Sequence, residues 1–289
     1  MNKTSEETKT RYTDVASWEL SDSLWEQMEP LLPKPKSRFR GRGAARRNIG
    51  GRPAADRRQM MSGILYVLRT GCQWNAVPAA YGSGKTVHSY FQAWRRAGVF
   101  KRLWASGLGT YDELIGIDWH WQAADGAMTK APLGGAKTGP NPTDRGKCGT
   151  KRSLLVDERG VPLALVISGA NTPDCKLLEP TLQNVVIERP DVHDTPQHLC
   201  LDKGYSGAPS TIAAETAGYT VHVPDKANAK TKRRRQPGRR KARRWVVEVA
   251  HSWINRFRRL LVRWEKKDCN YLALLHFACA IICWRKCEV

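Results

Sequence analysis

HLCLDKGYSG, residues 198–207, carries the signal that decides the fold of this 289-residue chain. Its apolar start, LCL, predicts a short buried strand, and the two glycines that follow predict a loop after it. The strand ends on an acid, Asp202. A buried carboxylate without a partner is costly, so Asp202 needs either a basic neighbour such as Lys203 or a metal ion.

The sequence around this strand alternates between β and α patterns. Residues 113–126 alternate apolar and polar positions, which predicts a strand, and residues 151–168 form two apolar runs around DERG, which predicts a hairpin. Together these elements predict an α/β fold with a mixed sheet and helices packed on it. The further elements, in chain order, are a helix over 174–188, the strand that ends at Asp202, a helix over 211–218, a strand over 219–224, a long helix from Arg243 and a final helix.

The N-terminal part of the chain shows helical periodicity instead. Ser23 and Glu26 have the spacing of a capping box, which predicts that a helix begins there. Basic residues edge the helices that follow, and this suits either a helix placed in the DNA major groove or a plain helical packing module. Three of these helices are predicted around residues 61–68, 87–94 and 100–104.

The chain is strongly basic, with a formal net charge of +21 and a pI of about 9.9. Such a chain is expected to bind a polyanion, and nucleic acid comes before a merely basic or ribosome-associated role. The charge is clustered. Residues 33–53 hold eight basic and no acidic residues and predict a flexible segment without secondary structure. Residues 225–244 hold eleven basic residues against one acid, which favours contact with a phosphate backbone.

Several functional classes are not expected. The N-terminus is polar, and the longest apolar run, residues 271–284, is too short to span a bilayer and predicts a buried helix. The eight dispersed cysteines fit reduced thiols better than a disulfide framework. YGSGKT at 81–86 resembles the end of a phosphate-binding loop, but position 79 is alanine where the motif needs glycine. A nucleotide cofactor is therefore not expected.

Three acidic residues in separate elements are candidates for a metal site. Asp125 follows the first strand, Asp202 ends a later strand, and Glu248 lies on the long helix. Carboxylates from separate elements can converge on divalent cations, and two such ions support phosphodiester chemistry. The simpler alternatives are a turn residue at Asp125, a pair between Asp202 and Lys203, and a surface pair between Glu248 and Arg244. Other acids compete for the role: Asp118, Asp144, Asp157 and Asp174.

Four long blocks form a further pattern: DGAMTKAP (125–132), GPNPTDRGKCGTKRSLLVDERGVPLALVISGAN (139–171), LDKGY (201–205) and RRWVVEVAHSWINRFRRL (243–260). These blocks resemble the DDE transposases of bacterial insertion sequences, in particular the group named after insertion sequence five. The resemblance runs over nearly the whole chain. It implies a ribonuclease-H-like catalytic core whose acid triad maps onto Asp125, Asp202 and Glu248. The triad would hold Mg²⁺, for which Mn²⁺ could substitute.

The resemblance also implies what the protein does. A DNA transposase would bind the terminal inverted repeats of its insertion sequence, cleave the element ends and join the 3′-hydroxyl to target DNA. A helical DNA-binding module over 1–108, with a basic flexible segment at 33–52, would precede a catalytic domain over 109–289 with a basic insertion at 225–244. A homodimer on DNA, no membrane association and a cytoplasmic, nucleoid-associated location are expected. The alternatives are a catalytically inactive, transposase-derived DNA-binding protein and a metal-dependent nuclease without strand transfer.

Basic residues of both parts are the predicted DNA contacts. The family's Tyr-Arg-Glu-Lys signature around the glutamate matches at Arg244, whereas Lys241 stands at the tyrosine position and Asn255 at the lysine position. The neighbouring Arg256 is expected to supply the missing basic contact, and Lys203 could contact a phosphate or balance the acids. The full set comprises Arg57, Arg58, Lys85, Arg95, Arg96, Lys203, Arg233, Arg234, Arg235, Arg239, Arg240, Arg244 and Arg256.

Overall fold

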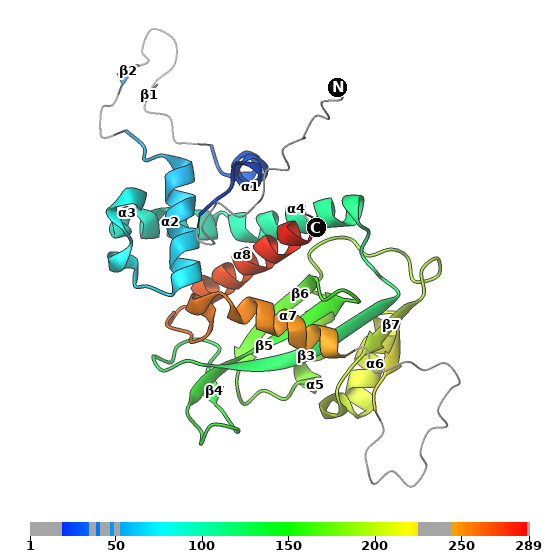
Figure 1. Cartoon of the computed structure of the whole chain (residues 1–289). Coiled ribbons are helices and arrows are strands. Elements are labelled where there is room, and N and C mark those ends of the chain that lie inside the picture. Colours follow the sequence, from blue (N-terminus) through cyan, green and yellow to red (C-terminus); the bar gives the residue numbers. More distant parts are fainter. Residues whose placement is uncertain (1–18, 35–38, 41–46, 49–52, 225–243, 288–289) are drawn as a thin grey trace, which may run out of the picture.

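A mixed sheet forms the centre of the computed structural model, which describes residues 19–34, 39–40, 47–48, 53–224 and 244–287 (Figure 1). Within these residues the sheet has six strands: β5 runs antiparallel to β3, β4 and β6, whereas β7 runs parallel to β3 and β8 runs parallel to β7. This is the predicted α/β, ribonuclease-H-like arrangement. The strands are β3 (Trp121–Lys130), β4 (Gly139–Pro140), β5 (Cys148–Asp157), β6 (Pro162–Gly169), β7 (Gln197–Cys200) and β8 (Tyr219–His222).

The predicted hairpin is the pair β5 and β6. The turn between them is built on Asp157, whose Oδ1 accepts hydrogen bonds from the backbone N–H groups of Arg159 (2.9 Å) and Val161 (2.8 Å). Gly160 in the same turn has φ 81°, a conformation that suits glycine. Asp157 is fully buried, so this carboxylate is part of the fold and not of a surface site.

The strand predicted over 113–126 begins later than expected. The preceding helix, α4 (Val99–Leu114), continues to residue 114, and β3 begins only at Trp121. Between them Asp118 accepts hydrogen bonds from the backbone N–H groups of His120 and Trp121, which makes a turn. Within this connecting segment Ile117 and Trp119 are buried whereas Ile115 is exposed, and period-2 spacing alone cannot distinguish such a connection from a strand.

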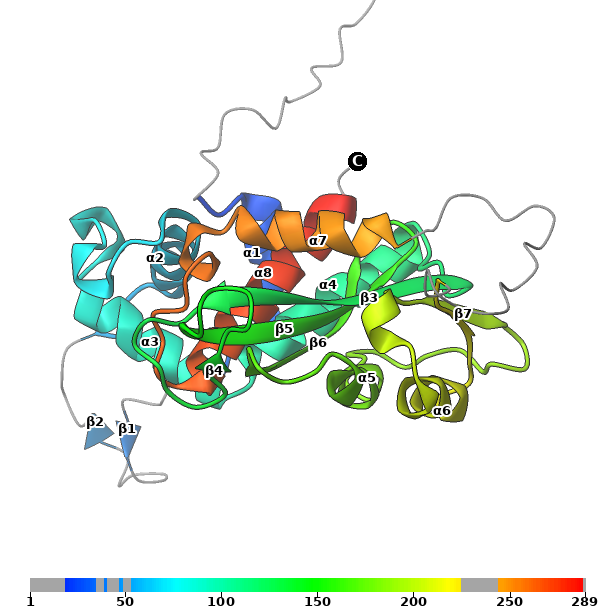
Figure 2. The same ribbon diagram turned by 90° about the horizontal axis from the view of Figure 1, so that it is seen from below.

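Helices cover both faces of the sheet (Figure 2). The predicted helix over 174–188 ends at 182, and the predicted long helix ends at Asn255. Its expected apolar positions Phe257 and Leu260 are nevertheless buried, in or beside the 3₁₀ turn η6 (Arg258–Leu260). α5 (Cys175–Leu182) and α6 (Ala208–Thr216) lie on one face, and α7 (Trp245–Asn255) and α8 (Asp268–Cys287) lie on the other.

The N-terminal region is mainly helical, as expected, with two local corrections. The first helix is capped by Ser21, whose Oγ accepts from the backbone N–H of Leu24 at 3.3 Å, and not by Ser23. The segment 33–53, predicted to hold no element, contains a short antiparallel pair, because strand pairing uses backbone groups and needs no apolar alternation. The elements are α1 (Asp22–Met28), η1 (Glu29–Leu31), β1 (Phe39–Arg40), β2 (Arg47–Asn48), α2 (Arg57–Thr70), η3 (Trp74–Ala76), η4 (Ala79–Tyr81) and α3 (Gly84–Arg96).

The YGSGKT segment leads into a helix. The side chain of Ser83 accepts a hydrogen bond from the backbone N–H of Thr86 at 3.2 Å, and α3 begins at the next residue, Gly84. This is an ordinary helix N-cap. The local sequence is thus explained by helix capping.

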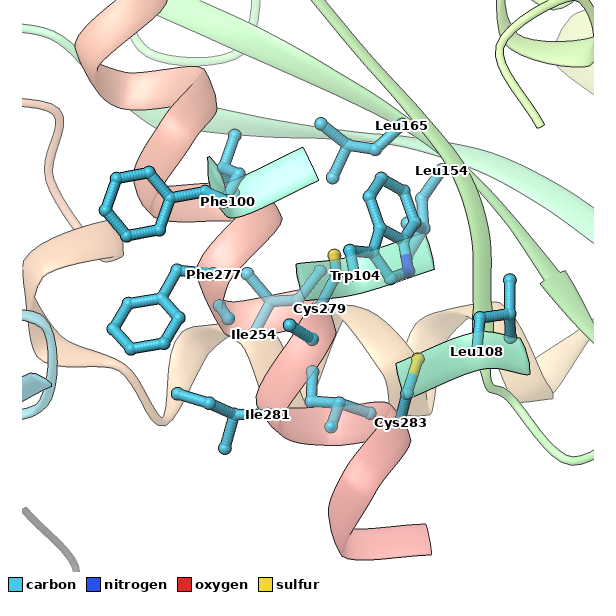
Figure 3. Packing of buried hydrophobic residues seen from close by; sticks show 14 of the residues in the cluster. Phe100, Trp104, Leu108, Leu154, Leu165, Ile254, Phe277, Cys279, Ile281 and Cys283 are labelled. Atoms are coloured by element: carbon cyan, nitrogen blue, oxygen red, sulfur yellow. The ribbon is translucent and has the colours of Figure 1, made fainter. Parts of the chain in front are cut away.

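One hydrophobic core joins the N-terminal helices to the sheet. α8 is buried around almost its whole circumference, between α4 and the sheet (Figure 3). Trp104 of α4 is fully buried and donates its indole N–H to the carbonyl of Pro162 on β6 at 3.1 Å. The boundary predicted near residue 108 falls inside α4. No helix in the described ranges is long and apolar enough to cross a bilayer, and all eight cysteines are free thiols.

Candidate active site

Asp125 lies in the middle of β3, whereas the sequence predicted that it follows the strand. It stands opposite Leu154 of β5, and its Oδ1 accepts from the backbone N–H of Gly126 at 2.8 Å. Burial raises the pKa of the Asp125 carboxyl, whereas the hydrogen bond from Gly126 and the charge of Arg244 oppose that rise. The nearby charges of two further acids also raise this pKa, which means that Asp125 belongs to an acidic cluster.

Asp202 lies beside Asp125 because of the strand register. β3 and β7 are parallel neighbours, and Ala123 pairs with Cys200. Asp125 and Asp202 each lie two residues beyond that pair, and the charge of Asp202 acts on the Asp125 carboxyl. The buried strand predicted from LCL is confirmed as β7, which ends two residues before Asp202.

Glu248 comes to the same place from α7, the helix that packs on β3 and β5. One turn further along α7, Nε2 of His251 lies 3.4 Å from the backbone oxygen of Asp125. Arg244 connects the acids: its guanidinium lies 2.5 Å from Oδ1 of Asp202 and 3.1 Å from Oε1 of Glu248. Arg244 thus joins Asp202 to Glu248, and the charges of Arg244 and Asp202 act on the buried carboxyl of Asp125.

The simpler alternatives can now be compared with the contacts. The surface pair between Glu248 and Arg244 exists, but the same guanidinium also binds Asp202. Lys203 is exposed, and the partner of Asp202 is Arg244. Arg244 therefore makes both the local pair with Glu248 and the long-range contact with Asp202, and spacing along one helix predicts only the first.

His251 and Arg152 line the inner side of α7, and the sequence reasoning missed both. His251 is 7% exposed, and burial, aided by the charge of Arg152, lowers the pKa of its imidazole to about 3. Arg152 is 1% exposed and donates to Oδ1 of Asn255 at 2.9 Å. His251 is therefore neutral at physiological pH. The only available signal was its place three residues after Glu248, which does not reveal burial.

The competing acids separate into two groups. Asp118 and Asp157 bind backbone N–H groups in turns, and Asp144 lies 3.5 Å from Lys130. Asp174 is different because its carboxylate contacts the backbone next to Asp125. A Cβ added to Gly126 would lie 2.1 Å from Oδ1 of Asp174, so a side chain at this position would displace that carboxylate. The structure adds this fourth acid to the neighbourhood of the candidate site.

The donor chemistry of the site suits a hard divalent cation. Asp125, Asp202 and Glu248 offer only carboxylate oxygens, the ligands that Mg²⁺ prefers. In the part of the chain that the structure describes, no group of three or more His, Cys, Asp or Glu side chains has the geometry of a formed metal site. The positive charge between Asp202 and Glu248 is that of Arg244. The carboxylate oxygens of Asp125, Asp202 and Glu248 are suitable ligands for a divalent cation, which would replace the guanidinium of Arg244 between the last two.

The predicted DNA contacts differ in their surroundings. Arg57 pairs with Glu29 of η1 and Arg58 with Asp22 of α1, so both arginines hold the first helical segment against α2. Arg95 donates to Gln92 and to the thiol of Cys269. The exposed members of the set are Lys85, Arg96, Lys203 and Arg256, whereas Arg233, Arg234, Arg235, Arg239 and Arg240 lie outside the described residues.

Comparisons with known proteins agree with this architecture. Residues 120–283 match the family described as "Transposase DDE domain", and residues 20–104 match "Putative transposase of IS4/5 family". The "Putative transposase for insertion sequence element IS402" of Burkholderia cepacia is 34% identical over 161 residues, 52% of this chain and 70% of that protein. The "Insertion element IS402 uncharacterized 16.2 kDa protein" of the same organism is 36% identical over 125 residues, 43% of this chain and 80% of that protein. No solved structure matches the chain. The chain therefore belongs to the DDE transposases of the IS4/5 family.

Proposed function

We propose that this transposase binds the terminal inverted repeats of its insertion sequence, cleaves at the element ends and joins the 3′-hydroxyl to target DNA. Asp125, Asp202 and Glu248 would hold Mg²⁺, with Mn²⁺ as a substitute. The observation that supports the proposal is that Arg244 contacts both Asp202 and Glu248, while its charge and that of Asp202 also act on Asp125.

The three acids have different mechanical roles in this proposal. Asp125 is fixed by strands on both sides of β3, and Asp202 is fixed by the end of β7. Glu248 is more exposed and projects from a helix, so it can adjust to the cation and the DNA. Bound at these carboxylates, a divalent cation would activate water and stabilise the leaving oxygen of a phosphodiester.

Arg244 would change partners during the reaction. Its guanidinium now neutralises Asp202 and Glu248. With a cation held by these carboxylates, the guanidinium of Arg244 would be available for a phosphate of the element end, a group that it can bind through two parallel hydrogen bonds. Exposed Lys203 and Arg256 lie close in sequence to the acids and would hold the same DNA strand through its backbone.

A homodimer on DNA is part of the proposal, because two element ends must meet before they are joined to one target. The helical region up to about residue 108 would bind the ends, with Lys85 and Arg96 as exposed contacts. The net charge of +21 supports strong, salt-dependent binding to the DNA backbone.

A strand-transfer assay tests this function. Purified full-length protein is mixed with DNA that carries the native element ends and with a plasmid target, in Mg²⁺ or in EDTA. We expect joined products that need the metal and that disappear in Asp202→Asn. Asp144→Asn, which changes an acid paired with Lys130 away from the cluster, is the matched control and should keep joining.

The same assay separates the alternatives. Binding of the ends without cleavage in any divalent metal would favour a transposase-derived DNA-binding protein. Nicked ends without joined products would favour a metal-dependent nuclease. Joining that persists in Asp202→Asn would remove this acid from the catalytic set.

A further inference from the structure

Three polar residues lie behind the candidate acids, on the α5 face of the sheet: Lys151, Asp174 and Tyr205, here called the polar layer. Lys151 and Tyr205 are buried, and Asp174 is partly exposed. Lys151 is 6% exposed, and its Nζ lies 3.1 Å from Oδ1 of Asp174. Ser153, two residues along β5 and therefore on the same face as Lys151, accepts a hydrogen bond from the hydroxyl of Thr181 of α5. This face of β5 is thus the one opposite α7 (Figure 2). The polar layer is therefore separated from Arg244 and Glu248 by the sheet.

Asp174 approaches Asp125 because Gly126 has no side chain to keep its carboxylate away. Gly126 pairs with Ser153 across β3 and β5, so the hydrogen that replaces its side chain points towards the polar layer. Oδ1 of Asp174 would lie only 2.1 Å from a Cβ at this position. The carboxylate of Asp174 thus rests against the backbone of the residue that directly follows Asp125.

Tyr205 connects the polar layer to the other aspartate. It ends η5 (Lys203–Tyr205), the turn that follows Asp202, and its backbone N–H donates to the carbonyl of Asp202 at 3.0 Å. The side chain is 1% exposed, and its hydroxyl faces the side chain of Ser153 on the same side of β5. Burial raises the pKa of this hydroxyl, the charges of Asp174, Asp125 and Asp202 raise it further, and the interaction with Ser153 opposes the rise.

Asp174 and Tyr205 therefore lie next to the two aspartates of the candidate site. Oδ1 of Asp174 is paired with Lys151 and rests against the backbone at Gly126, and the charges of Asp174, Asp125 and Asp202 all act on the hydroxyl of Tyr205. Polar groups that are buried and connected in this way hold the backbone beside them in one arrangement.

We propose that Asp174, held by Lys151, and Tyr205 are positioning residues that fix Asp125 and Asp202 at the spacing which a shared divalent cation requires. This inference rests on the proposed function. Groups behind metal ligands orient them, and their loss typically lowers metal affinity or activity about 10- to 100-fold. The competing explanation is a buried ion pair and a tyrosine that serve stability alone.

The test measures metal binding directly on the full-length protein, with Mn²⁺ as the probe. Electron paramagnetic resonance reports free Mn²⁺ during a titration, and end cleavage is measured in parallel across Mn²⁺ concentrations. We expect Asp174→Asn to weaken Mn²⁺ binding about tenfold and Tyr205→Phe to weaken it severalfold, with cleavage recovering at higher Mn²⁺. Urea unfolding without metal reports any change in stability alone.

Matched controls separate positioning from general damage. Asp144→Asn changes the other aspartate paired with a lysine, at the end of β3 away from the acids, and Tyr219→Phe removes a buried hydroxyl that donates to Gln122. Both should bind Mn²⁺ as the wild type does. If Asp174→Asn does not fold, because the buried ammonium of Lys151 loses its counter-ion, Tyr205→Phe carries the test, since it removes only the hydroxyl and keeps the buried ring.

The outcomes are distinct. Wild-type Mn²⁺ affinity in both Asp174→Asn and Tyr205→Phe overturns the inference, provided that Asp202→Asn loses binding. Equal Mn²⁺ binding by the wild type and Asp202→Asn overturns the proposed function and this inference with it. If Mn²⁺ binding weakens in proportion to the loss of stability, in Asp174→Asn and Tyr205→Phe and equally in the two control variants, the polar layer serves stability alone.

Discussion

At the scale of single residues, Arg244 shows how one side chain organises a cluster of acids. Asp202 and Glu248 carry like charges and would repel each other if no cation lay between them. The guanidinium relieves this repulsion, because it contacts both carboxylates at hydrogen-bond distance. All three side chains are partly exposed, so solvent screens the pairs and keeps them exchangeable.

Arg244→Gln is therefore expected to tighten Mn²⁺ binding while it lowers end cleavage. The change removes a positive charge that competes with the metal, and an exposed ion pair contributes at most about 1 kcal/mol, so the gain is at most about fivefold. Calorimetric titration with Mn²⁺ measures it, with Arg96→Gln as an exposed arginine control outside the acidic cluster. Weaker Mn²⁺ binding in Arg244→Gln would mean that the arginine positions the acids instead of competing.

At the scale of elements, the site depends on the register between two parallel strands and on one crossing helix. The pair Ala123 and Cys200 aligns β3 with β7, and Asp125 and Asp202 each follow that pair by two residues. α7 packs on β3 and β5 and carries Glu248, which shares Arg244 with Asp202. A one-residue slip of β7 would turn its buried side chains to the wrong face, so core packing protects the register.

The β5–β6 turn gives a pH prediction at this scale. Burial raises the pKa of Asp157 from 3.8 to about 6, so the folded chain holds this proton more tightly than the unfolded chain. The folded state then binds more protons between about pH 4 and pH 6, and the contribution of this group to stability falls as pH rises through that window. The loss between pH 4.5 and pH 7 is about 2 kcal/mol by this linkage.

Asp157→Asn removes this dependence. Relative to the wild type, the free energy of unfolding of the variant should improve by about 2 kcal/mol between pH 4.5 and pH 7, as measured by urea unfolding at both values. The amide oxygen can still accept from Arg159 and Val161, so the turn is retained. A wild-type and variant difference that is independent of pH would contradict a raised pKa at Asp157.

At the scale of the whole molecule, the N-terminal helices and the catalytic fold share one core. Phe100, Trp104 and Leu108 of α4 face the same cluster as Phe277 and Ile281 of α8 (Figure 3). α8, the last described helix, thus packs against a helix from the first half of the chain. The two regions are expected to unfold together.

Trp104→Ala tests this coupling. Removal of the indole leaves a cavity between α4, α8 and β6, and the free energy of unfolding should fall by about 3–5 kcal/mol. Hydrogen exchange should show that α2 and β5 lose protection at the same urea concentration. Leu114→Ala, on the exposed end of the same helix, should change little because Leu114 is 66% exposed. Loss of protection in α2 alone would show two independent folding units.

Several helices and strands could be predicted from the sequence, because short-range periodicity and turn residues specify them. LCL before Asp202 predicted β7, DERG predicted the hairpin, and the helical spacing of Val87, Phe91 and Trp94 predicted α3. Patterns failed where local spacing has two explanations: the alternation in 115–121 belongs to a connection, and the cap of α1 is Ser21. For the acids, spacing left the choice open, and the resemblance to DDE transposases selected the triad.

Only the tertiary structure decided which charged groups meet. Asp118, Asp144, Asp157 and Asp174 look equivalent along the chain, yet packing turns two of them into turn caps and sets Asp174 against Gly126. Arg244 binds Asp202 from 42 positions away as well as Glu248 from four. The physical reason is that a side chain's propensity acts over a few residues, whereas ion pairs and strand register depend on contacts between segments that the sequence keeps far apart.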